Sequence, residues 1–228
     1  MSKNTLEENI FTLHDSVKSA IVERLFQESA VSVQYASWVC DYLAQINVLA
    51  HCSAAIACAA AGGDITKMTP LLTSWYLFVL AADIHDDIQD GETEKYAGTD
   101  DETLSFALFL VAWSSQTLCQ LKVPLAVYRK VERKMRAAYL GAARGQLTIV
   151  TKQANQRQYL ARIIETSATP LGHYYACGIY FAPNIDERIE KAFYEYGVAL
   201  GTCSQLKDDL EDLQTDLHSG NLTLPILH

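Results

Sequence analysis

The chemistry this sequence suggests first lies in two clusters of aspartates. In "DIHDDIQD" four carboxylates fall at i, i+3, i+4 and i+7 and so share one stripe of a helix: Asp83, Asp86, Asp87 and Asp90. Like charges one turn apart repel by roughly a few tenths of a kcal/mol per pair. Positions 68–94 contain no Lys or Arg to offset that repulsion. The stripe therefore needs to be neutralised by something outside the helix.

A second acidic cluster lies in "QLKDDLEDLQTDL", at Asp208, Asp209 and Asp212. Like the first, it follows an apolar helical run. Asp86/Asp90 and Asp208/Asp212 are i,i+4 pairs, so each pair presents oxygens from adjacent turns. Two such helices facing each other would supply hard oxygen ligands for Mg²⁺ ions that also bind substrate phosphates. A single DDxxD also arises on an ordinary solvated helix face, whereas two such boxes favour a metal–diphosphate site.

The elements that must position these boxes are helices. The 3.6-residue periodicity dominates, and no convincing alternating strand pattern is present. Helices are expected over 5–29, 31–62, 68–91, 101–121, 124–152, 155–181 and 185–218. Pro170, inside one of these patterns, predicts a kink or a break. The pattern predicts a single closely packed all-α domain over residues 1–228, with at least one central helix.

Composition narrows the class of protein. Half of the 228 residues are hydrophobic, and 11 Gly and 5 Pro are few, which suits a helical globule. The net charge of −9 argues against nucleic acid and against an anionic membrane surface as partners. The uncharged stretch 43–63 contains polar side chains and favours a buried helix over a membrane span. Six cysteines without a CxxC pair are interpreted as reduced core residues of a cytoplasmic protein.

From about residue 45 to the end, the chain resembles the trans-isoprenyl diphosphate synthase (polyprenyl synthetase) family. "IHDDIQD" and "LGTCSQLKDDLED" look like the family's two aspartate-rich motifs, "ARGQL" at 143–147 looks like its GQ element, and "TDLHSGNLTLP" at 215–225 is similar to a third motif. The resemblance implies an all-α isoprenoid-synthase bundle around a central cavity. It also implies three Mg²⁺ ions that bridge both boxes to an allylic prenyl diphosphate.

The resemblance assigns roles residue by residue. The expected direct metal ligands, and candidate catalytic residues, are Asp86, Asp90 and Asp208. The carboxylates expected to ligate or to orient metal-bound water are Asp87, Asp209 and Asp212. Contacts with the substrate are expected at Lys95, Gln205 and Lys207. The small residues Ala81 and Ala82 favour a deep pocket for a long prenyl tail. Asp83 is shared with prenyltransferases that modify competence pheromones, and its role stays open.

The implied reaction is heterolysis of an allylic C–O bond. The departing diphosphate must be stabilised by metal ions acting as Lewis acids and by nearby cations. The allylic cation left behind needs a dry pocket, because water would quench it. The apolar run "LLTSWYLFVLAA" is expected to form one wall of that pocket.

The half of the site that would bind isopentenyl diphosphate departs from the family pattern. A basic element is expected near 46–52, where the chain reads "INVLAHC" and only His51 could stand in for a cation. The positions of the family's paired arginines and of two of its lysines hold Lys95, Tyr96, Thr166 and Asn221. Each charge-assisted contact removed weakens diphosphate binding by roughly 1.5–3 kcal/mol. This half of the site is therefore expected to be eroded, with the arginines near 129–144 as candidate replacements.

Several destinations for the allylic cation stay open. One is another nucleophile, as in the pheromone-modifying prenyltransferases. A second is the substrate's own double bond, which would make the protein a terpene-synthase-like cyclase or lyase. A third is chain elongation with isopentenyl diphosphate. An alternative that is not an enzyme is a non-catalytic subunit of a heteromeric prenyl synthase. The resemblance also implies a homodimer, and the chain is expected to lack the family's C-terminal helices.

Overall fold

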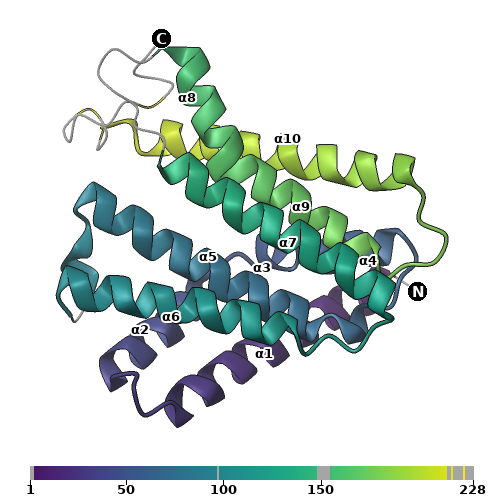
Figure 1. Ribbon diagram of the computed structural model, residues 1–228, viewed down its shortest axis with the longest axis horizontal. Coiled ribbons are helices and arrows are strands. Elements are labelled where there is room, and N and C mark those ends of the chain that lie inside the picture. Colours follow the sequence, from purple (N-terminus) through teal and green to yellow (C-terminus); the bar gives the residue numbers. More distant parts are fainter. Residues whose placement is uncertain (1–2, 97, 148–154, 215–216, 218–222, 224–228) are drawn as a thin grey trace. The chain divides into compact units, whose positions relative to one another are not determined.

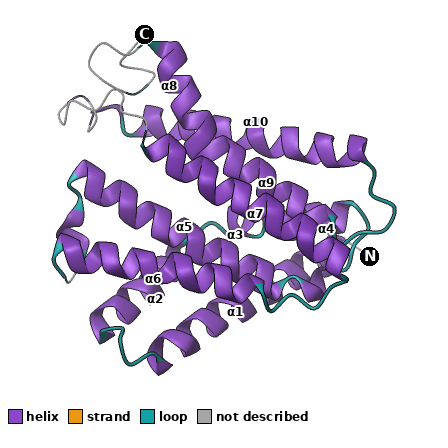
Figure 2. Cartoon of the chain, in the orientation of Figure 1, coloured by secondary structure: helices purple, strands orange, loops and turns teal. Residues whose placement is uncertain are grey.

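In the computed structural model the described part of the chain is built of helices joined by loops and turns, with no strand (Figures 1 and 2). The described residues are 3–96, 98–147, 155–214, 217 and 223. Contacts divide the chain into two compact units, one of residues Met1–Tyr128 with Phe181–Pro183, and one of Arg129–Tyr180 with Asn184–His228.

The first unit holds the helices of the amino-terminal half. They are α1 (Lys3–Gln27), α2 (Val33–Gln45), α3 (Val48–His51), α4 (Ser53–Ala60), the 3₁₀ turn η1 (Ile65–Lys67), α5 (Thr69–Asp90), the 3₁₀ turn η2 (Thr93–Lys95) and α6 (Asp100–Leu118). The second unit holds most of α7 (Leu125–Gln146), then α8 (Gln156–Ile163), the π-helical turn η3 (Ile164–Ala168), α9 (Thr169–Ile179) and α10 (Glu187–Glu211).

Helix α5 is the central helix of the first unit. Every side chain from Leu71 to Phe78 is buried, and the helix packs against α6 and α1 (Figure 1). Pro70 lies in its first turn, where its missing N–H costs no hydrogen bond. Gly91 ends the helix with φ of 77°, a conformation that glycine adopts without a Cβ penalty. The first acidic box therefore occupies the last turns of a helix whose body is core.

The single helix expected over 31–62 was wrong, because the structure has three helices there. Helix α2 ends at Gln45, and Ile46 is extended with φ −64° and ψ 145°. The side chain of Asn47 then accepts hydrogen bonds from the backbone N–H groups of Leu49 and Ala50, at 2.9 and 3.3 Å. Asparagine readily caps a new helix in this way, so it starts α3 instead of continuing α2.

The kink or break predicted at Pro170 corresponds to the π-helical turn η3, which runs directly into α9 without a gap in the helix. Proline lacks an N–H and its ring crowds the carbonyl four residues earlier, and a wider turn relieves both problems. The turn packs against the GQ element of α7. A Cβ on Gly145 would lie 2.4 Å from the Thr166 side chain, so only glycine fits there.

Helices α9 and α10 pack closely because glycines line their contact. A Cβ on Gly197 would lie 2.8 Å from the Cα of Gly172, and one on Gly201 would lie 2.8 Å from the Cα of Ala168. An ion pair of 2.8 Å between Lys134 and Glu190 joins α7 to α10. These contacts hold the helix that carries the second acidic box.

The prediction that the cysteines lie in the core holds for half of them. All six are free thiols. Cys52, Cys58 and Cys177 are buried, Cys40 is intermediate, and Cys119 and Cys203 are exposed. Within the described residues no helix has both the length and the apolar character that a membrane crossing requires.

Candidate active site

The first acidic box presents its aspartates in different directions. Asp86 is exposed, whereas Asp83 and Asp87 are partly buried. The side chain of Asp90 lies outside what the structure describes. The stripe read from the sequence is therefore not a uniform solvated face, because two of its carboxylates are held by other residues of the same unit.

Asp87 is held by the residues that follow the box. The Tyr96 hydroxyl donates a hydrogen bond to its Oδ2, and the ammonium of Lys95 lies 2.8 Å from the same oxygen. Burial and the bonded carboxylate raise the pKa of Tyr96, so its hydroxyl stays protonated and can donate. Lys95, expected to contact substrate, thus forms an ion pair with the box, and buried Tyr96 lies against it as well.

Asp83 is held from the other side, by α2. The Tyr42 hydroxyl donates to its Oδ2 at 2.6 Å. Burial, together with the charges of Asp87 and Asp86, raises the pKa of Asp83 to about 6, although the Tyr42 hydrogen bond opposes the shift. A carboxyl in such a place needs a partner. The structure supplies a tyrosine hydroxyl.

The second acidic box lies at the end of α10, and it also contains both exposed and buried aspartates. Asp208 is exposed, and so is Asp212, the C-cap residue of the helix. Asp209 is only 4% exposed and accepts hydrogen bonds from the Tyr159 hydroxyl at 2.5 Å and from the Gln205 amide at 3.3 Å. The box is therefore anchored to α8 through Asp209.

The two residues of α10 that were predicted to contact substrate, Gln205 and Lys207, interact with other side chains of the second unit. The amide oxygen of Gln205 accepts a hydrogen bond of 2.8 Å from Ser167, so this side chain links the second box to η3. Lys207 is exposed and forms an ion pair of 2.7 Å with Glu211, one turn along α10. Gln205 thus orients Asp209, and Lys207 lies on the exposed face of the helix.

Both Asp-Asp pairs follow one rule. The first aspartate (Asp86, Asp208) is exposed, and the second (Asp87, Asp209) is turned inward to a tyrosine hydroxyl. Exposed carboxylate oxygens suit a hard divalent cation, and inward neighbours with fixed hydrogen bonds would keep them in place. The donor set thus fits Mg²⁺, although no three His, Cys, Asp or Glu side chains of the described part form a preassembled metal cluster.

The residues expected to contact the prenyl tail and the second substrate differ in burial and in charge. Ala81 is fully buried in α5, and Ala82 is partly exposed. His51 is not a good stand-in for a cation. Burial lowers its pKa, its Nδ1 lies 3.0 Å from the carbonyl oxygen of Asn47, and its ring meets Tyr76 edge-on. Asn221, and all of the 215–225 motif except 217 and 223, lies outside the described residues.

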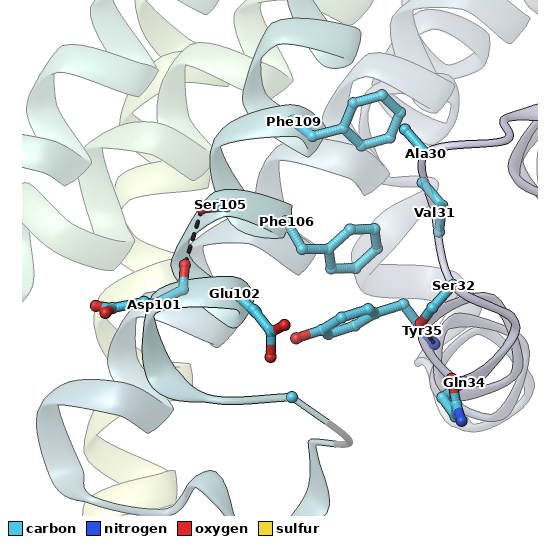
Figure 3. Close-up of a pocket in the computed structure, with 11 residues that line it drawn as sticks. Ala30, Val31, Ser32, Gln34, Tyr35, Asp101, Glu102, Ser105, Phe106 and Phe109 are labelled. Carbon is cyan, nitrogen blue, oxygen red and sulfur yellow. Dashed lines mark hydrogen bonds between the residues drawn. The ribbon is translucent and has the colours of Figure 1, made fainter.

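A cavity of about 640 Å³ lies in the first unit between the α1–α2 turn and α6 (Figure 3). The Tyr35 and Phe106 rings stack there with centroids 4.6 Å apart, and Phe109 follows along α6. None of the site residues expected from the sequence lines this cavity. It is therefore separate from the first box.

Sequence reasoning missed the tyrosines that orient the boxes. Tyr42 lies 41 residues before Asp83, and Tyr159 lies 50 residues before Asp209. A buried tyrosine needs a partner for its hydroxyl, but this signal does not say which partner. Only the tertiary hydrogen bonds of Tyr42 to α5 and of Tyr159 to α10 identify it.

The helical bundle is that of the isoprenyl diphosphate synthases, which confirms the expected resemblance and the all-α isoprenoid-synthase fold. A geranylgeranyl pyrophosphate synthetase from the archaeon Geoglobus acetivorans matches 99% of this chain and 78% of its own, with a TM-score of 0.82 and 20% identity. A polyprenyl synthase from Caulobacter crescentus CB15, solved with calcium and isoprenyl diphosphate, matches 99% of this chain and 73% of its own, with a TM-score of 0.78 and 21% identity.

Sequence comparison points the same way. Heptaprenyl diphosphate synthase component 2 of Bacillus subtilis (strain 168) is 26% identical over 183 residues, which is 72% of this chain. The chain spans about half, 52%, of the length of that relative. No family model matches the sequence.

Proposed function

We propose that this protein is a Mg²⁺-dependent prenyltransferase that binds an allylic prenyl diphosphate through its two aspartate boxes and ionises it. The observation that carries the proposal is the shared division of the two boxes. In each, one carboxylate faces solvent and its neighbour is fixed inward by a tyrosine hydroxyl. The repetition of this division in both boxes supports a shared role for them.

The roles of the residues follow from this division. Asp86 and Asp208, with Asp90 and Asp212, would bind Mg²⁺, which supplies Lewis-acid stabilisation to a departing diphosphate. Asp87 and Asp209 would not bind the metal directly but would orient the helix ends. The polyprenyl synthase from Caulobacter crescentus was solved with calcium and isoprenyl diphosphate, which supports a divalent cation and a prenyl diphosphate as the groups to be bound.

The fate of the prenyl group is proposed from the charges of the described residues. His51 is neutral at neutral pH, and Lys95 is paired with Asp87 at 2.8 Å. Two of the candidate replacement arginines, Arg136 and Arg144, are also in ion pairs, with Glu132 and Glu165. These pairings favour transfer to a nucleophile other than isopentenyl diphosphate, or cyclisation, over ordinary elongation.

The name of the Bacillus subtilis relative favours a second candidate, in which the chain is one component of a heteromeric prenyl synthase. In that case full activity would require a partner chain, and the expected homodimer would be replaced by a heteromer. The two candidates share the same boxes and differ in their quaternary state.

Product analysis tests the proposal. The protein would be incubated with Mg²⁺ and labelled geranyl, farnesyl or geranylgeranyl diphosphate, with and without isopentenyl diphosphate. Alcohols or hydrocarbons formed without isopentenyl diphosphate, and lost in Asp86→Asn, are the expected result. Longer diphosphates formed only with isopentenyl diphosphate would show elongation instead. Unchanged turnover in Asp86→Asn would refute the assignment of the box.

A further inference from the structure

The first box is flanked by an aromatic cluster, here the α2 cluster, made of Trp38, Tyr42 and Tyr96. The Trp38 ring lies between the two tyrosines, with centroids 5.7 Å from Tyr42 and 4.9 Å from Tyr96, the latter in an edge-on contact. Trp38 and Tyr42 are one turn apart on α2, so they share a face of that helix. The indole ring of Trp38 therefore packs against both tyrosine rings and helps to hold their hydroxyl groups in place.

Both hydroxyls reach α5, and they reach it one turn apart. Tyr42 donates to Asp83 at 2.6 Å, and Tyr96 donates to Asp87. An ionised carboxylate can only accept, so each tyrosine must be the donor. Lys95 adds a positive charge 2.8 Å from Asp87 and lies 5.7 Å from the centre of the Tyr96 ring. The inward face of the box is thus fixed at two successive turns.

Fixing two turns of a helix end also fixes the direction of the residue between them. Asp86 lies between Asp83 and Asp87 in sequence and is exposed. If the last turns of α5 could rotate or fray, binding a cation through Asp86 would first have to order them. Side chains that orient a metal ligand typically contribute about 10–100-fold to metal affinity or activity. The α2 cluster is placed to make that contribution.

We propose that Asp83 is a positioning residue and not a metal ligand: its bond to Tyr42, backed by Trp38, orients the end of α5 and so aims Asp86 at the metal. The inference rests on the proposed role of Asp86. It gives a function to a carboxyl that the sequence leaves unexplained. The Tyr42 hydroxyl already occupies Oδ2 of this partly buried carboxyl and directs it towards α2, whereas Asp86 is exposed.

The alternative of a purely structural bond makes a different prediction. A bond that only stabilises the first unit would change the free energy of unfolding and leave metal affinity unchanged in the folded protein. Positioning changes both. The Mg²⁺ dependence of substrate binding is therefore the readout that separates the two roles.

The experiment measures the dissociation constant of labelled farnesyl diphosphate as a function of Mg²⁺, alongside urea unfolding of every variant. Tyr42→Phe and Asp83→Ala should each weaken Mg²⁺-dependent binding about tenfold. Asp83→Asn should recover most of that loss, because its amide oxygen can still accept from Tyr42. Asp86→Asn should abolish the binding.

The chain offers a matched control on the same helix. Tyr35 is a buried tyrosine of α2 whose hydroxyl lies 2.9 Å from Thr103 Oγ1, on α6 instead of α5. Tyr35→Phe removes a comparable buried hydroxyl without touching the box. It should lower stability and leave the Mg²⁺ dependence of binding within about twofold of the unsubstituted protein, since it leaves every contact of the box in place.

Two results would overturn the inference while leaving the proposed function intact. If Asp83→Asn loses as much as Asp86→Asn, Asp83 is a ligand. If Tyr42→Phe behaves like Tyr35→Phe, the α2 cluster does not position the box. Absence of Mg²⁺-dependent binding in the unsubstituted protein would instead refute the proposed function, and the inference with it. Asp83→Asn keeps its hydrogen bond, so it decides between ligand and positioning even if Tyr42→Phe does not fold.

Discussion

Replacing Gly197 with alanine should loosen the helix pair that holds the second box. The new Cβ would lie 2.8 Å from the Cα of Gly172 and 2.9 Å from the carbonyl oxygen of Leu171, both backbone atoms of α9 that cannot turn aside. Overpacking of this kind costs typically about 1–3 kcal/mol, and backbone contacts belong at the upper end. Alanine returns about 1 kcal/mol of helix propensity. The net expectation is a loss of about 2 kcal/mol in the free energy of unfolding.

Gly141→Ala is the matched control, because it makes the same change inside α7 with room for the methyl group. Its Cβ would meet Glu165 O at 3.6 Å and Thr169 Cγ2 at 3.9 Å, which are ordinary contacts. This variant should gain about 0.5–1 kcal/mol from helix propensity alone. Urea unfolding followed by far-ultraviolet circular dichroism measures both. A Gly197→Ala protein as stable as the unsubstituted one would refute the close packing of α9 on α10.

Three further predictions concern the second unit. Tyr159→Phe removes the donor at 2.5 Å from buried Asp209 and should lower the free energy of unfolding by about 1.5–3 kcal/mol in a urea titration. Burial lowers the pKa of His173 to about 4, and Lys134 adds to the shift, so the unfolded chain binds its proton first. The contribution of neutral His173 to the free energy of unfolding should therefore be fully present above pH 6.5 and be lost as the pH drops towards 4. His173→Gln should flatten this decline of the free energy of unfolding with pH. An unchanged slope in that variant would contradict the prediction. Asn155→Ala removes the capping bond to the Gln158 N–H at 3.0 Å and should lower the melting temperature, at a cost of about 1 kcal/mol, with Gln156→Ala as a control that should change little.

The helices that carry the boxes were predictable from the sequence because their patterns are long and regular. Helix α5 was expected over 68–91 and runs over Thr69–Asp90, with Gly91 as its stop signal. An irregularity at Pro170 was predictable for the same local reason, since proline cannot continue the hydrogen bonds of an α-helix. Its π-helical form was not, because it depends on how η3 packs against Gly145.

The division of each box into outward and inward aspartates could not be predicted. On a helical wheel Asp86 and Asp87 lie about 100° apart, as do Asp208 and Asp209, but the acidic pattern alone does not say which of the two faces inward. Tertiary contacts made by Tyr96 and Tyr159 distinguish them, and nothing in the local sequence of α10 points to a tyrosine 50 residues away. The motif resemblance pointed to the two boxes as the candidate site, and contacts with neighbouring helices distinguish the directions of their aspartates.

Equilibrium binding of labelled farnesyl diphosphate at increasing Mg²⁺ tests the central claim most directly. The account predicts saturable binding that requires the cation and is lost both in Asp86→Asn and in Asp208→Asn. Binding that persists in a chelator, or that survives either substitution unchanged, would contradict it.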